Sequence, residues 1–127
     1  MPFVTMLYAG ILGLISIAVA FPAGQLRGKL GIPLGDGGSV ALLHAMRRQA
    51  NFIEVVPMAL ILIALLEMSG VSRYAIHGLG AALVFFRLCH AIGFKAESMT
   101  GPGRVIGASG SALLTVVASV WAIIRFF

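Results

Sequence analysis

The hydrophobic and polar positions divide the chain into four long apolar stretches separated by three polar connections. The stretches cover about residues 3–26, 40–69, 71–94 and 104–126, each near the roughly 20 residues needed to cross a bilayer. Backbone groups in lipid must be paired within their own segment, which favours helices. The pattern therefore predicts an all-α integral membrane protein, and short connections between helices imply antiparallel neighbours. We expect a single domain over residues 1–127, folded as a four-transmembrane-helix up-down bundle.

The composition agrees with this class. Of the 127 residues, 60% are hydrophobic and 10% are charged, whereas a soluble domain carries about 25% charged residues. The apolar run from Pro2 to Gly24 follows no Lys or Arg and exceeds the roughly 7–15 residues of a signal-peptide core. We therefore interpret it as a spanning helix. Cys89 is the only cysteine, so no disulfide within the chain is expected.

Basic residues are unevenly divided between the two ends of the predicted bundle. The end with the first and third connections holds six of them: Arg27, Lys29, Arg47, Arg48, Lys95 and Arg104. The other end holds only Arg73 and Arg125. The positive-inside rule places the six-charge end in the cytoplasm and both termini outside. For Lys29, Arg48 and Lys95, this effect on topology is a sufficient explanation.

A polar cluster extends into the second apolar stretch. Arg47, Asn51 and Glu54 fall within about 60° of one another on a helix, and His44 lies at the edge of the same arc. Polar groups at such depth are costly and are usually kept for binding or transport. The spacing therefore predicts one wall of a ligand site.

The third stretch carries a second polar arc, formed by Arg87, His90 and Phe94. Arg87 lies about two turns inside the end of this stretch, where an unpaired Arg costs about 2.5–3.5 kcal/mol. Glu54 is a natural partner, so one interpretation is an Arg87–Glu54 ion pair that holds the bundle together. This interpretation is compatible with a ligand site, because one pair leaves the other polar residues free.

The combined set indicates a site for a small, mainly anionic ligand that also carries a positive group. Its members are Arg27, Arg47, Asn51, Glu54, Arg87, His90 and Arg104. Arginine binds carboxylates bidentately, and a Glu suits an ammonium group. The histidines lack acidic or thiolate companions at ligand spacing, so no metal site is expected. The chain carries no nucleic-acid-binding motif.

Small residues recur at a spacing of three to four on two stretches. The first carries Ala9, Gly13, Ser16, Ala20 and Gly24, and the fourth carries Ala108, Ser111, Thr115, Ala118 and Ala122. Such stripes allow close helix contact in lipid, either within one chain or between subunits.

Four polar motifs follow one another along nearly the whole chain. They are Gln25-Leu26-Arg27, Arg47-x-Gln49-x-Asn51-x-x-Glu54-x-x-Pro57, Arg87-x-x-His90 and Pro102-x-Arg104. Together they resemble the motifs of the MAPEG family, the membrane-associated proteins in eicosanoid and glutathione metabolism. The Gly35-Asp36-Gly37-Gly38 loop is similar to that of small bacterial members, which implies a bacterial inner membrane.

The resemblance implies a homotrimer with three glutathione sites between adjacent subunits, near the cytoplasmic face. The tripeptide would be bound by matched residues from three helices: Arg27, Arg47, Asn51, Glu54, Arg87 and His90. Arg104 would be the catalytic residue beside the sulfur, where a guanidinium favours the thiolate form. The thiolate would attack a lipophilic electrophile arriving from the bilayer lipids, as in a detoxifying glutathione transferase or peroxidase.

Departures from the family pattern keep two other functions open. Val55 and Phe94 occupy positions where relatives can carry Tyr, and Val105 stands where the prostaglandin synthase has Ser. Fewer hydroxyls favour the alternative of a non-catalytic protein that binds lipophiles or glutathione. The other alternative is a small multidrug transporter. Proteins of that class resemble one another in carrying a Glu in the first helix, whereas here no charged residue precedes Arg27, which argues against a transporter.

Overall fold

The computed structural model describes residues 1–93 and 101–127 and contains four α-helices within these ranges. They are α1 (Phe3–Leu30), α2 (Val40–Met68), α3 (Arg73–Ile92) and α4 (Pro102–Phe126). Each helix is long and apolar enough to cross a membrane. The predicted all-α bundle of four membrane-spanning helices is therefore confirmed.

A glycine ends α1, and a serine side chain caps the start of α2. α1 continues beyond the predicted residue 26, and its last residue is Leu30. Gly31 follows as the C-cap, with a φ of 64° in the left-handed region. Glycine adopts this conformation without steric cost. α2 begins after Ser39, whose hydroxyl oxygen accepts a hydrogen bond from the Leu42 amide at 3.3 Å. This is an ordinary side-chain cap.

The other two helices differ from expectation by two residues at both ends of α3 and at the start of α4. Ser72 caps α3, which therefore begins at Arg73 instead of residue 71, and the helix ends at Ile92. α4 begins at Pro102, where the missing N–H is no loss because the first helical amides have no intrahelical partner. Phe94 and Lys95 lie outside the described residues.

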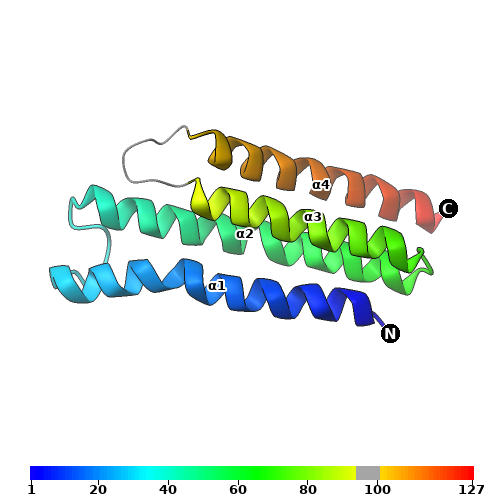
Figure 1. The fold of residues 1–127 in the computed structure, drawn as a ribbon, viewed down its shortest axis with the longest axis horizontal. Coiled ribbons are helices and arrows are strands. Elements are labelled where there is room, and N and C mark those ends of the chain that lie inside the picture. Colours follow the sequence, from blue (N-terminus) through cyan, green and yellow to red (C-terminus); the bar gives the residue numbers. More distant parts are fainter. Residues whose placement is uncertain (94–100) are drawn as a thin grey trace.

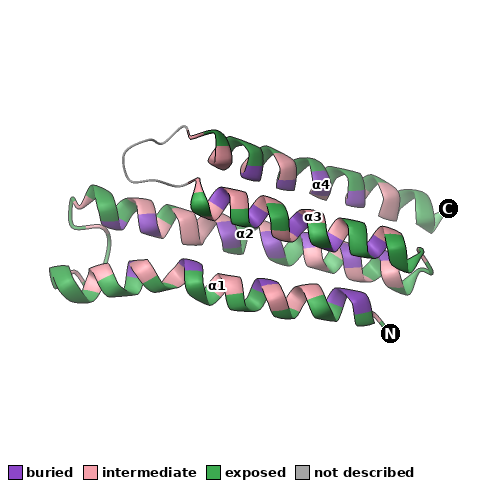
Figure 2. Ribbon diagram, in the orientation of Figure 1, coloured by how far each residue is buried: buried purple, intermediate pink, exposed green. Residues whose placement is uncertain are grey.

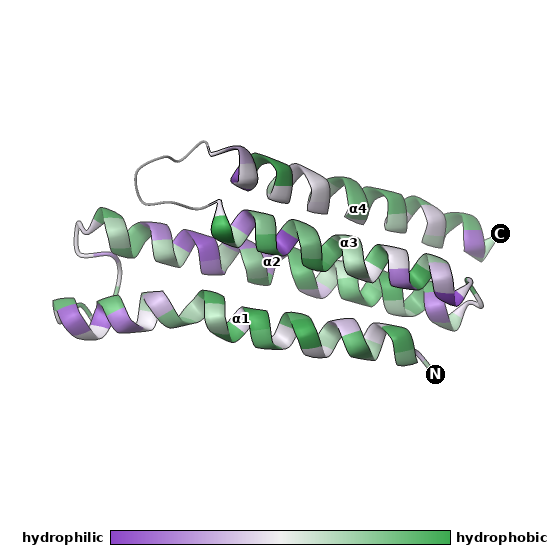
Figure 3. Cartoon of the chain, in the orientation of Figure 1, coloured by the Kyte–Doolittle hydropathy of each residue, from purple (hydrophilic) through white to green (hydrophobic). Residues whose placement is uncertain are grey.

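The helices alternate in direction, and α2 and α3 lie between α1 and α4 (Figure 1). Among the described residues, every pair of helices packs together except α1 with α4. Both termini lie at one end of the bundle, which we call the terminal end. The opposite end, which holds Arg27, Arg47, His90 and Arg104, is called the basic end. Figure 3 shows hydrophilic residues gathered on α1 and α2 at the basic end.

Buried residues lie mainly on the inward faces of the helices (Figure 2). The main core is apolar and joins all four helices; its fully buried members include Leu12, Ile63, Leu66, Ile76, Leu83 and Ala118. The buried polar residues of the described chain are Thr5, Arg87, His90 and Ser111. Two of these, Arg87 and His90, belong to the predicted site.

The two stripes of small residues have different surroundings. Ser111 and Ala118 of the α4 stripe are buried inside the subunit. In the α1 stripe Gly13 and Gly24 are exposed, and a Cβ added at either would meet no atom within 4 Å. The α4 stripe therefore packs within the chain, whereas the glycines of the α1 stripe do not.

Glu67 fixes the start of α1 at the terminal end. Its carboxylate accepts hydrogen bonds from the amides of Val4 and Thr5, both at 2.8 Å, and from the Thr5 hydroxyl at 2.7 Å. The first amides of a helix have no partner within the helix and favour a negative charge. The end of α2 thus caps the beginning of α1.

Candidate functional site

Arg87 lies at the centre of the polar site. Its side chain is 1% exposed. Nη1 donates to Oδ1 of Asn51 at 2.9 Å, and Nη2 donates to the carbonyl oxygen of Gly107 at 2.7 Å. One guanidinium from α3 therefore binds α2 and α4 at once. The predicted ion pair between Arg87 and Glu54 is wrong, because Asn51 receives the guanidinium and Glu54 is exposed.

The helical positions on α2 explain why Asn51 is the partner of Arg87. At about 100° per residue, Asn51 lies about 40° from Arg47 and about 60° from Arg48 on the opposite side. It therefore stands at the boundary between two flanks of α2. Arg47 and Glu54 occupy the outer flank and are exposed, whereas Arg48 is half-buried on the inner flank.

The outer flank carries charged groups that the subunit itself does not neutralise. Across the described residues, neither Arg47 nor Glu54 has a hydrogen-bond or ion-pair partner. Asn51 is half-buried beside them. Because its carbonyl oxygen accepts from Arg87, its amide NH₂ remains as a donor. The outer flank thus offers a cation, an anion and an amide donor in one row.

The inner flank contains a cluster of basic groups around His90, which is 4% exposed. Arg87, Arg104 and Arg48 all lie close enough to interact electrostatically with it. The Nε atoms of Arg48 and Arg87 are buried without a hydrogen-bond partner in the described chain. Arg48, whose charge was expected only to set the topology, therefore lies beside the predicted site residue His90. The 60° separation of Arg48 from Asn51 is the signal that could have revealed this position.

Gly107 allows the close approach of α3 and α4 at this site. A Cβ placed there would lie 2.5 Å from the Cβ and amide nitrogen of His90 and from the carbonyl oxygen of Phe86. The Gly107 carbonyl also accepts from the Ser111 hydroxyl at 2.8 Å. Sequence reasoning missed this glycine. Its spacing of four residues from Gly103 and from Ser111 is a small-residue motif that could have revealed it.

The remaining two predicted residues are Arg27, whose hydrogen bonds reach none of the other predicted residues, and Arg104, which lies near His90. Arg27 is half-buried, and its guanidinium donates to the Ile32 carbonyl at 3.3 Å and to the Met46 sulfur at 3.4 Å. Arg27 thus joins α1 to the segment between α1 and α2, through Ile32, and to α2 itself, through Met46. Arg104 is half-buried in the first turn of α4.

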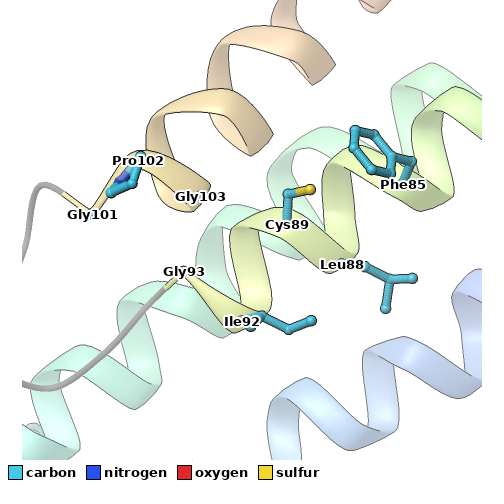
Figure 4. Close-up of a pocket in the computed structure, with 8 residues that line it drawn as sticks. All are labelled: Phe85, Leu88, Cys89, Ile92, Gly93, Gly101, Pro102 and Gly103. Atoms are coloured by element: carbon cyan, nitrogen blue, oxygen red, sulfur yellow. The ribbon is translucent and has the colours of Figure 1, made fainter.

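A cavity of about 700 Å³ lies between the end of α3 and the start of α4 (Figure 4). Its lining is mainly apolar and consists of Phe85, Leu88, Cys89, Ile92, Gly93, Gly101, Pro102 and Gly103. The last of these precedes Arg104 in the chain. The described residues contain no group of three or more His, Cys, Asp or Glu side chains that could hold a metal ion.

Four spanning helices with a buried basic cluster at one end define a multi-pass integral membrane protein with a polar site inside its bundle. Comparison with known proteins identifies the family: the profile of the MAPEG family matches residues 5–124, and the chain belongs to this family. It is 32% identical over 119 residues to inner membrane protein YecN of Escherichia coli (strain K12), covering 93% of this chain and 91% of the relative. YecN of E. coli O6:H1 matches equally. No solved structure matches the chain.

Proposed function

We propose that this protein is a membrane-bound glutathione transferase or peroxidase that acts on lipophilic electrophiles. In the transferase reaction, the glutathione thiolate attacks an electrophilic carbon, a C–S bond forms, and the leaving group departs with its electron pair. Family membership and the polar site support this proposal, and the likeness to an inner membrane protein supports a location in that membrane.

The exposed charges on the outer flank of α2 carry the proposal. Glu54 is fourteen residues after Val40, which places it about 21 Å along a helix of about 43 Å. This is the middle of the helix. A charged side chain facing lipid at that depth costs about 2.5–3.5 kcal/mol. The outer flank therefore faces protein, ligand or water instead of lipid.

A second subunit would keep this flank out of the lipid, and the resemblance to the MAPEG family implies that the subunits form a homotrimer with sites between neighbours. The exposed glycines Gly13 and Gly24 of α1 support this arrangement, because small residues let helices of two subunits approach closely. The groove beside them, between α1 and α2, is lined by Gly13, Ser16 and Pro57 among others. The six basic residues at one end favour a cytoplasmic location for the sites.

The outer flank is chemically complementary to glutathione, which has two carboxylates and one ammonium group. Arg47 suits a carboxylate, Glu54 suits the ammonium, and the free NH₂ of Asn51 suits a carboxylate or carbonyl oxygen. Arg87 is buried and already bonded, so in this proposal it orients Asn51 and reaches the ligand through it. His90 is buried on the inner flank, so in this proposal it supports the site from behind Arg87, and Arg27 holds α1 against α2 at the same end.

The lipophilic substrate would enter the apolar cavity beside α4. Leu88 and Cys89 line this cavity, and Gly103 places it next to Arg104. A guanidinium beside the glutathione sulfur stabilises the thiolate, because an adjacent positive charge favours the ionised form. Arg104 would therefore activate the thiol at the boundary between the polar site and the apolar cavity.

Conjugation of an aryl halide with glutathione tests the proposal directly. The purified protein should accelerate the reaction, and Arg104→Ala should abolish the acceleration. Arg125→Ala is the matched control, because it removes the same charge at the terminal end. An equal rate for Arg104→Ala and the unaltered protein would refute the role of Arg104.

Calorimetry with glutathione in detergent separates the enzyme from a non-catalytic relative. Val55, half-buried on α2, and Val105, exposed on α4, supply no hydroxyl to the site and favour that alternative. Glutathione binding without turnover would support a binding protein of the same fold. Absence of glutathione binding would refute the proposed site, and Glu54→Gln should weaken any binding that is observed.

A further inference from the structure

A second polar feature lies at the terminal end, far from the site described above. A depression of about 430 Å³ is formed between the first turns of α1 and α3. On the α1 side it is lined by Phe3, Val4 and Leu7, and on the α3 side by Arg73, Tyr74 and His77. One wall is therefore apolar, and the other carries a guanidinium, a phenol and an imidazole.

Arg73 carries a positive charge that the described residues at this end do not balance. It is exposed, and none of the described residues provides a hydrogen-bond or ion-pair partner for its side chain. The neighbouring charged groups are already bonded: Glu67 caps α1, and Arg125 donates to the Ser69 carbonyl. The Arg73 guanidinium is therefore available to an anion from outside the subunit.

The imidazole beside Arg73 is held in place by α1. Nδ1 of His77 and the hydroxyl of Tyr8 are hydrogen-bonded at 3.0 Å, and the two rings meet edge to face at a centroid distance of 5.7 Å. The Tyr8 ring in turn packs on Gly80, where a Cβ would lie 2.2 Å from it. This packing keeps the polar wall fixed relative to α1.

The position of the depression along the span indicates the shape of its ligand. Arg73 and Phe3 are the first residues of α3 and α1, and Leu7 lies one turn further along α1 toward the membrane interior. A ligand in this place meets a cation at the helix end and apolar side chains next to the membrane interior. Exposed Tyr74 is typical of the membrane–water boundary.

We propose that this depression binds the phosphate group of an anionic phospholipid from the leaflet at the terminal end. Arg73 would bind the phosphate oxygens, since its planar fork matches phosphate geometry. Tyr74 and His77 would contribute hydrogen bonds, and the acyl chains would lie along Phe3 and Leu7. This site is independent of glutathione.

Native mass spectrometry of the delipidated protein, titrated with phosphatidylglycerol, tests the proposal. Arg73→Gln should weaken phosphatidylglycerol binding about tenfold, the effect of losing one charge-assisted hydrogen bond. Arg73→Lys should retain part of the affinity. The matched control Arg125→Gln removes a charge at the same end but outside the depression, and it should bind like the unaltered protein.

Two results would overturn the proposal. The first is equal phosphatidylglycerol binding by Arg73→Gln and Arg125→Gln, which would mean that only the net charge of this end matters. The second is displacement of the lipid by inorganic phosphate at equal concentration, which would show that free phosphate is the ligand. Arg73 is exposed, so thermal unfolding of Arg73→Gln and Arg73→Lys should match that of the unaltered protein.

Discussion

The close contact at Gly107 makes a sharp prediction about stability. In Gly107→Ala, the new Cβ would lie 2.5 Å from two backbone atoms, the His90 nitrogen and the Phe86 oxygen. Ordinary van der Waals contact begins at 3.4 Å, so α3 and α4 must separate by about 0.9 Å. Backbone atoms inside a helix cannot rotate away, and the separation therefore moves the helix as a unit.

The magnitude follows from what this separation breaks. The Arg87–Gly107 hydrogen bond would lengthen from 2.7 Å to about 3.6 Å, beyond hydrogen-bond range. Losing a hydrogen bond to a charged group costs about 1.5–3 kcal/mol, and overpacking costs about 1–3 kcal/mol. Replacing Gly by Ala inside a helix returns about 1 kcal/mol. We expect the free energy of unfolding to fall by about 1.5–5 kcal/mol.

Reversible unfolding in mixed detergent micelles, followed by circular dichroism, measures this difference. Gly78→Ala is the matched control, since Gly78 lies within α3 and a Cβ there would meet no atom within 4 Å. The control should be unchanged or up to about 1 kcal/mol more stable. If Gly107→Ala were as stable as Gly78→Ala, the close packing of α3 on α4 at this position would be refuted.

Three further changes test other parts of the structure. Glu67→Gln should lower the free energy of unfolding by about 1 kcal/mol and speed hydrogen exchange of the first α1 amides, because a charged cap is lost; unchanged exchange would contradict the cap. Gly80→Ala should lower the free energy of unfolding by about 1–3 kcal/mol, because the new Cβ overpacks against Tyr8. Adding Tyr8→Leu to this variant should recover part of the loss. If the effects of the two substitutions simply added, the contact between Gly80 and Tyr8 would be refuted. Cys89→Phe should fill the cavity of Figure 4 and lower conjugation of a bulky electrophile more than glutathione binding; equal conjugation would place the lipophile elsewhere.

Much of the fold could be predicted from the sequence, because long apolar segments in lipid have few alternatives to helices. The four spans, their alternating direction and the cap at Ser39 follow from local properties of the chain. The periodicity of α2 also placed Arg47 and Glu54 correctly on one flank. These features depend on residues close in sequence, so a pattern along the chain can reveal them.

The partner of Arg87 could not be predicted in this way. Both Asn51 and Glu54 lie on the same arc of α2, and charge alone favoured Glu54. The structure decided for Asn51 because the guanidinium sits on the inner side of α2, between α2 and α4, where it also reaches the Gly107 carbonyl. The same argument applies to Arg48, whose half-buried position depends on how α2 is rotated toward α3.

The sequence by itself therefore determined a four-span membrane bundle with its basic residues gathered at one end. Only the tertiary structure decided which of these residues are bonded inside the subunit and which remain exposed on its surface. The physical reason is that hydropathy and helical periodicity are local, whereas burial and hydrogen bonding depend on the rotation and spacing of helices that are distant in sequence. That spacing is set at residues such as Gly107, where the absence of a side chain lets α3 and α4 meet.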